Sequence, residues 1–204
     1  MPNWCSNKMV VVGPKQDLLN LVEKLEEAKK IASEKKQYFS LFCLLLALGY
    51  SEEEANQQFD FRGEFSDFDR TPWENEKGVS SITIWYESAW TPCIEAWETI
   101  LHRHFNDCAQ YTLAEEPGCE VFVNTDPTGE YLPERYNVDA SYHNSYFQDR
   151  YDGYYETKEK ALEDLNEWLG KSFKSIEEVE AFFEEAEEND DDAFFSFHEY
   201  TDWD

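Results

Sequence analysis

The order of strand-like and helix-like segments constrains the fold of this chain more than any other feature. Residues 7–13 (NKMVVVG) form a β-branched run that stops at Gly13-Pro14, a pattern typical of a strand. In 18–32 the apolar residues recur at helical spacing, with Glu and Lys on the other face. In 59–65 the phenylalanines at odd positions alternate with charged residues, which predicts a half-buried strand.

The next segments continue this alternation of strands and helices. Residues 80–87 (SSITIWYE) have the period of a strand, and Thr91-Pro92 then begins a helix whose apolar stripe runs to Phe105. A strand follows and ends at the turn Glu116-Pro117-Gly118. Residues 119–123 (CEVFV) return from that turn as a hairpin partner.

Taken together, these segments predict an α+β protein with a ferredoxin-like split βαβ arrangement, in which helices cover one face of an antiparallel sheet. The domain is expected to span 1–138, with a helical insertion near 36–60. The most apolar window, 38–50, has 13 residues and is well short of the ~20 that cross a bilayer, so it predicts a buried helix. Ser51 and Glu54 have capping-box spacing and open a second short helix.

Residues 139–204 are expected to form an acidic, mainly helical α/β extension packed on the first domain. They contain 21 acidic and 5 basic residues. One helix has an apolar stripe from Ala161 to Leu169, and the capping-box spacing of Ser175 and Glu178 opens another. The run 193–200 (AFFSFHEY) predicts an edge strand.

Charge and cysteine usage limit the partners and the compartment. The chain has 45 Asp and Glu against 17 Lys and Arg, a net charge of −28, which repels nucleic-acid phosphates and anionic membranes and favours basic proteins or cations. Its five cysteines are odd in number and scattered, which favours a reduced protein over a disulfide framework. The N-terminus has no signal-peptide pattern. We therefore expect a location in the cytoplasm, no membrane contact and no direct nucleic-acid binding.

Three motifs, taken in their order along the chain, resemble those of the YubB/Api-type proteins, a ferredoxin-like family of phages, plasmids and other mobile elements. They are Asn-Trp-Cys-Ser-Asn before the first strand, Trp-x-Pro before the second helix, and Glu-Pro-Gly in the hairpin. The residues that carry the resemblance are Asn3, Trp4, Cys5, Asn7, Trp90, Pro92, Glu116, Pro117 and Gly118. The resemblance spans roughly 1–130 and implies this fold and a mobile-element origin. It implies no catalytic residue.

The Trp-Cys pair at the start of the chain is interpreted as a structural corner. Trp4 can cover the end of a sheet, Cys5 can pack as a small buried hydrophobe, and an asparagine can satisfy the backbone where the strand begins. The alternative is a reactive or ligating Cys5.

Catalytic and metal-binding patterns receive little support. No Gly-x-Ser-x-Gly is present, and no local motif pairs a histidine with Ser or Cys, although a Cys–His pair formed by the fold stays open. His102 and His104 are two apart on a helix and make a poor chelate. Residues 187–192 (EENDDD) lack the glycine and spacing of a calcium loop. The sequence therefore predicts no enzyme, no metal and no cofactor.

The acidic residues of 177–192 are the candidate partner-binding surface. Outside its apolar stripe, the helix is covered by glutamates whose neighbours at i+3 and i+4 are about 5–6 Å apart. The candidate binding residues are Glu177, Glu180, Glu184, Glu185, Glu188, Asp190, Asp191 and Asp192.

Two hypotheses about function follow from the charge, the missing catalytic patterns and the resemblance. The first is a non-enzymatic protein of a phage or plasmid that binds a basic surface of a host protein, for example a counter-defence inhibitor that partly mimics nucleic acid. The alternative is an accessory interaction module that acts through apolar contacts, with incidental acidity. The sequence does not specify an oligomeric state.

Overall fold

The computed structural model describes residues 3–58, 62–143, 149–188 and 192–203. The chain forms a mixed α+β protein and divides into two compact units, Met1–Thr125 and Asp126–Asp204. Each unit contains an antiparallel sheet, its own helices and its own apolar core.

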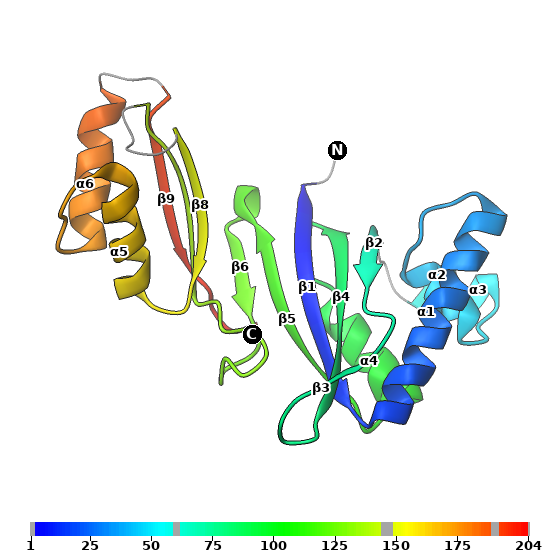
Figure 1. The fold of residues 1–204 in the computed structure, drawn as a ribbon. Coiled ribbons are helices and arrows are strands. Elements are labelled where there is room, and N and C mark those ends of the chain that lie inside the picture. Colours follow the sequence, from blue (N-terminus) through cyan, green and yellow to red (C-terminus); the bar gives the residue numbers. More distant parts are fainter. Residues whose placement is uncertain (1–2, 59–61, 144–148, 189–191, 204) are drawn as a thin grey trace. The chain divides into compact units, whose positions relative to one another are not determined.

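Antiparallel strands of the first unit form one sheet in the order β2-β4-β1-β5-β6, and β3 pairs with β4 (Figure 1). The strands are β1 (Trp4–Gly13), β2 (Gly63–Phe68), β3 (Trp73–Glu74), β4 (Ser80–Ala89), β5 (Ala109–Glu116) and β6 (Val121–Asn124). In the centre, Met9 of β1 lies between Ile84 of β4 and Thr112 of β5. The alternation predicted for 80–87 is confirmed, because its even-numbered residues are buried and Trp85 is exposed.

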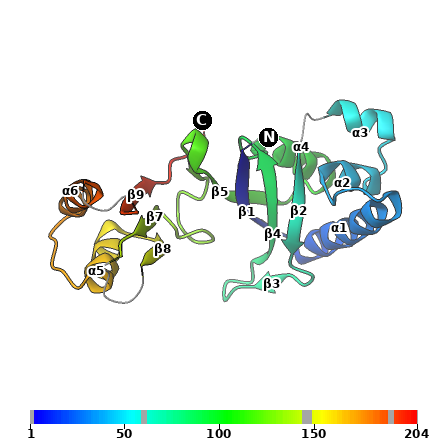
Figure 2. The ribbon, with the colours of Figure 1, turned by 90° about the horizontal axis from the view of Figure 1, so that it is seen from above.

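Helices α1 (Lys15–Lys35) and α4 (Ile94–His104) pack on one face of this sheet (Figure 2). Both contribute to a single core with the odd-numbered residues of β1 and the even-numbered residues of β4. Its members include Met9, Val11, Leu21, Leu25, Ile84, Trp97 and Ile100. The apolar stripes predicted for both helices are confirmed by their burial.

Two short helices, α2 (Leu41–Ala47) and α3 (Glu52–Gln58), lie between α1 and β2. Gly49, with a φ of 95°, ends the apolar segment in a backbone region that favours glycine. The predicted capping box is confirmed: Ser51 N–H donates to Glu54 Oε2 at 2.8 Å, and Glu54 N–H donates to Ser51 Oγ at 3.2 Å. Phe65 of the strand predicted over 59–65 is buried in β2, and residues 59–61 lie outside the described residues.

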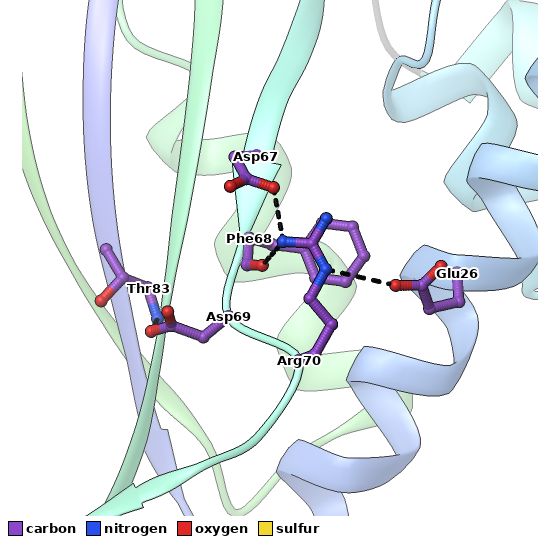
Figure 3. A network of polar contacts seen from close by, with 6 residues as sticks. All are labelled: Glu26, Asp67, Phe68, Asp69, Arg70 and Thr83. Carbon is purple, nitrogen blue, oxygen red and sulfur yellow. Dashed lines mark hydrogen bonds and ion pairs between the residues drawn. The ribbon is translucent and has the colours of Figure 1, made fainter.

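A polar network around Arg70 ties the end of β2 to α1 (Figure 3). The guanidinium donates to Asp67 and to the Phe68 carbonyl, and it lies 4.4 Å from the centre of the Phe68 ring. Its Nε is 3.5 Å from Glu26 Oε1 on α1. The hydrogen bond from Arg70 holds the pKa of Asp67 below its usual range. The network fixes the loop that leads into β3.

The second unit has a three-stranded antiparallel sheet in the order β8-β7-β9. Its elements are β7 (Tyr136–Ser141), β8 (Arg150–Tyr155), α5 (Lys158–Leu169), α6 (Ile176–Glu187) and β9 (Phe194–Glu199). Both helices pack on the same sheet face, and Val138 and Ala140 of β7 share one apolar core with Leu165, Trp168 and Phe183 of the helices. The edge strand predicted for the last segment is confirmed as β9.

The division between the units lies before the boundary expected at residue 138, which falls inside β7. Asp126 begins the second unit and organises the loop that leads into β7. Its buried carboxylate accepts N–H groups from Thr128, Gly129, Tyr131 and Leu132 at 2.7–3.1 Å. The change in charge near residue 138 does not mark the boundary, because β7 pairs with β8 and β9 and therefore belongs entirely to the second unit.

The second capping box differs from its prediction, although α6 begins where expected. Glu178 Oε2 accepts the N–H of Lys174 at 2.7 Å, one residue before the predicted donor Ser175. Ser175 instead hydrogen-bonds to Glu177, and this contact lowers the pKa of Glu177. The spacing of Ser175 and Glu178 correctly predicted where α6 begins, but it predicted the wrong hydrogen-bond partners for these two residues.

Candidate functional site

The three motifs that carry the family resemblance meet at one end of the first sheet. Asn3 accepts the N–H of Trp90 through its carbonyl at 2.9 Å, and its Nδ2 lies 3.8 Å from Cys119 Sγ. Gly118 approaches the same side chain so closely that a Cβ there would lie 2.7 Å from Asn3 Nδ2. Glu116 Oε1 accepts the N–H of Gly118 at 3.2 Å and shapes the hairpin turn. These motifs therefore form one corner of the fold.

Cys5 is completely buried in this corner, beside Ile94, Ala114 and Val123. Asn7 is also buried and donates from Nδ2 to the Cys5 carbonyl at 2.7 Å. Burial raises the pKa of the Cys5 thiol to about 12, so the protonated form dominates at neutral pH. Because the thiolate is the nucleophile and the metal ligand, this environment favours the packing role over a reactive one.

The candidate binding residues of α6 are exposed, as its amphipathic pattern predicts. Ile176, Val179 and Phe183 point into the core. The described candidates on the outer surface are Glu177, Glu180, Glu184, Glu185, Glu188 and Asp192. Asp192 Oδ2 lies 3.8 Å from His143 Nε2, and Asp190 and Asp191 lie outside the described residues.

The structure enlarges this surface with a second helix that the sequence argument did not include. Because α5 and α6 pack on the same face of one sheet, the outer surfaces of both helices belong to one layer. The acidic residues exposed on α5 are Glu159, Glu163, Asp164 and Glu167. We call the exposed Asp and Glu of α5 and α6, with Glu188, the acidic layer. The amphipathic pattern of 158–169 could have revealed the α5 part.

A groove of about 470 Å³ in the first unit is a further candidate site. It lies where β2 and β4 meet β1 and the segment before α2. Its lining residues are Trp4, Gln37, Tyr38, Ser40, Phe42, Arg62, Gly63, Glu64 and Glu87. Trp4 is 48% exposed, and the exposed part of its side chain lines the groove. The groove depends on strand register, so no local motif marks it.

The remaining titratable groups show no arrangement typical of a metal site. In the described ranges, no three His, Cys, Asp or Glu side chains are placed to hold a metal ion. His104 Nε2 lies 3.1 Å from the Tyr50 hydroxyl. The pKa of His104 is lowered, mainly by burial and to a smaller extent by the charge of Arg103. Burial also raises the pKa of Cys93 to about 12 and that of Cys108 to about 11.

One Ser–His contact was missed by the sequence argument, which considered only known catalytic motifs. Ser196 Oγ hydrogen-bonds to His198 Nε2 on β9. The two side chains meet because residues two apart on a strand point to the same face. The signal in the sequence is the Ser-x-His spacing within a predicted strand, and it indicates a hydrogen bond on a sheet surface.

Comparisons of the chain with protein-family models, curated proteins and solved structures give no match. The helices in the described part of the chain are too short or too polar to traverse a lipid bilayer.

Proposed function

We propose that this chain is a non-enzymatic protein of a mobile element that binds a basic surface of a host protein. The strand order β2-β4-β1-β5, with α1 and α4 on one face, supports a ferredoxin-like core to which β6 adds a strand. The meeting of the three motifs at one corner supports the YubB/Api-type resemblance, because distant segments that form one contact set belong to one structural feature.

The acidic layer is the observation that carries this proposal. Two helices with buried apolar stripes hold their carboxylates on one side of a packed unit, so the charges are fixed by the fold. Like charges at i+4 destabilise a helix by a few tenths of a kcal/mol per pair; such pairs occur at Glu180–Glu184 within α6 and at Glu184–Glu188, where Glu188 is the C-cap of the helix. A basic partner would relieve this repulsion when it binds.

Nucleic-acid mimicry is the form of binding that fits an ordered row of carboxylates. DNA presents regularly spaced phosphates, and the proteins that bind it do so largely through Lys and Arg. A folded acidic layer competes for the same side chains. We therefore propose as partner a nucleic-acid-binding defence protein in the cytoplasm of the host cell, which the chain inhibits without touching nucleic acid itself.

A second candidate function is supported by exposed aromatic residues of the first unit. Trp85 is 37% exposed on the sheet face opposite the helices, and Trp73 is 64% exposed on the neighbouring β3. Exposed aromatic groups favour association through apolar contacts. In this function the chain is an accessory module and its acidity keeps it soluble.

Competition with DNA at graded salt separates the two functions. The immobilised protein would be used to capture a nucleic-acid-binding protein from host lysate, and a labelled DNA duplex would then compete for the captured protein. Mimicry predicts mutual displacement and binding that weakens steeply as salt rises, because exposed charges are screened within about 10 Å at 0.1 M. If the captured protein binds DNA and this chain at the same time, and its affinity for the chain does not change with salt, the apolar module is supported instead.

A further inference from the structure

Two glutamates from neighbouring strands line the groove of the first unit. Glu64 of β2 and Glu87 of β4 are directly opposite each other in the antiparallel register. Such partners project from the same sheet face with their Cβ atoms about 4.5–5.5 Å apart, and like charges in this position destabilise the pair. Both side chains are partly buried, which weakens screening by water.

Within the described ranges, no Lys or Arg side chain forms an ion pair with Glu64 or Glu87. Arg62 lines the same groove, yet within the described ranges it forms no ion pair with Glu64 or Glu87. Gly63 keeps β2 close to β4, since a Cβ there would lie 2.0 Å from the Glu87 carbonyl oxygen. The backbone therefore holds Glu64 and Glu87 on adjacent strands, with their side chains on the same face of the sheet.

Aromatic rings form the other part of the groove. Trp4 of β1 is 48% exposed, Tyr38 is 76% exposed and Phe42 of α2 is partly buried. Aromatic faces attract Arg and Lys cations and also pack against their methylene groups. A volume of about 470 Å³ lies within the range of about 300–1,000 Å³ that is usual for ligand sites.

We propose that this groove receives an arginine or lysine side chain from an extended basic segment of the protein partner. The charged group lies between Glu64 and Glu87 and donates hydrogen bonds to both, and its aliphatic stem packs on Trp4 and Tyr38. This inference rests on the proposed function, in which the partner is basic. It adds a specific docking point in the first unit to the diffuse attraction of the acidic layer.

A pair of short peptides tests the groove with its charge as the only variable. The probes are N-acetyl-Gly-Arg-Gly-amide and the same peptide with citrulline, an uncharged arginine isostere. The indole N–H signal of Trp4, assigned by its loss in Trp4→Phe, would be followed by NMR during titration. We expect a saturable shift with the arginine peptide and none with the citrulline peptide.

Two double Glu→Gln variants, one in the groove and one in the acidic layer, show whether the arginine peptide binds at the groove. Glu64→Gln with Glu87→Gln should weaken arginine-peptide binding by about tenfold or more, because it removes both charge-assisted acceptors. The same variant should melt at an equal or higher temperature, since the repulsion is removed. Glu184→Gln with Glu188→Gln removes two charges from the acidic layer and should leave the titration unchanged.

Equal weakening by both double variants would overturn the inference, because it would show general attraction to a negative protein. Absence of a saturable Trp4 shift would overturn it as well. If partner capture then still weakens with salt and with substitutions in the acidic layer, the groove inference fails and the proposed function stands. If partner capture does not depend on salt while the arginine peptide still shifts the Trp4 signal, the acidic layer is refuted as the main contact.

Discussion

The backbone N–H of Trp90 donates a 2.9 Å hydrogen bond to the carbonyl of Asn3, and this contact joins β1 to the turn before α4. Trp90 has a φ of 73°, in the left-handed region that a bulky residue rarely occupies. Ser88 Oγ donates to the Thr91 carbonyl at 2.8 Å and holds the other side of the turn. The corner therefore maintains a strained residue through contacts between segments far apart in the chain.

Substitutions at Trp90 should reveal this strain. Trp90→Val should lower the free energy of unfolding by about 1–2 kcal/mol more than Trp90→Gly, because a β-branched residue fits a positive φ poorly and glycine fits it well. Both variants lose the same ring, so their difference isolates the backbone. Urea unfolding measures it, and equal free energies would contradict the assignment of strain to this residue.

Cys5 provides a test of the corner as a structural feature. Cys5→Ala should lower the free energy of unfolding by about 1–3 kcal/mol through lost packing, and the folded variant should bind its partner normally. Cys119→Ala is the control, since Cys119 is exposed and its substitution should change stability by about 0.5 kcal/mol or less. Loss of partner binding in Cys5→Ala at an unchanged melting temperature would point to a reactive thiol.

The elements that the sequence predicted are those with a local periodic signal. The apolar stripes of α1, α4, α5 and α6 and the alternation in β4 are each encoded within one segment, and the structure contains all of them. Ser51 and Glu54 form their capping box because both partners lie within one helical turn. Local chemistry is sufficient for features of this kind.

Features that depend on pairing between segments could not be predicted in the same way. The strands β7 and β8 contain Asp, Asn, Arg and Gly and have weak strand propensity, and their pairing with each other and with β9 stabilises them. The groove requires the register that sets Glu64 opposite Glu87. The hydrogen bond from Lys174 N–H to Glu178, in place of the predicted one from Ser175, likewise depends on the path of the chain before α6.

The loop around Asp126 should make the stability of the second unit depend on pH. Burial acts to raise the pKa of Asp126, but hydrogen bonds from Tyr131, Leu132 and Thr128 outweigh it, and the pKa lies below its usual value. A folded pKa below the unfolded value of about 3.9 contributes stability at higher pH, and this contribution is lost as pH falls through the folded pKa.

Asp126→Asn should therefore lower the free energy of unfolding at pH 7 by about 1.5–3 kcal/mol, the range for hydrogen bonds to a charged acceptor. The difference from the unsubstituted protein should shrink as the pH falls below about 3.9. Urea titrations followed by circular dichroism at pH 7 and pH 3 measure both values. A difference that is the same at both pH values would show that the charge of Asp126 is not what stabilises the loop.

The acidic layer is tested by removing charge from one stretch of α6. The variant replaces four glutamates by glutamine, at Glu177, Glu180, Glu184 and Glu188, all of which are exposed. Because like charges at i+4 repel, removing the charges at Glu180, Glu184 and Glu188 should offset the loss of the hydrogen bond that Ser175 makes to charged Glu177, so the fold should be retained. Its affinity for the captured basic partner should nevertheless fall, most strongly at low salt, where steering by the acidic surface is greatest. Thermal unfolding and binding at two salt concentrations give both results on one sample.

A control variant with the same change in net charge separates a local surface from overall charge. It carries four glutamate-to-glutamine substitutions at exposed positions of the first unit, Glu23, Glu95, Glu98 and Glu120. General attraction depends on net charge, so it would weaken binding equally in both variants. A docked carboxylate row would weaken only with the α6 variant. If the α6 variant binds at low salt as tightly as the unsubstituted protein, α6 is excluded as the mimic surface, and the exposed tryptophans of the first unit become the stronger candidates for the contact.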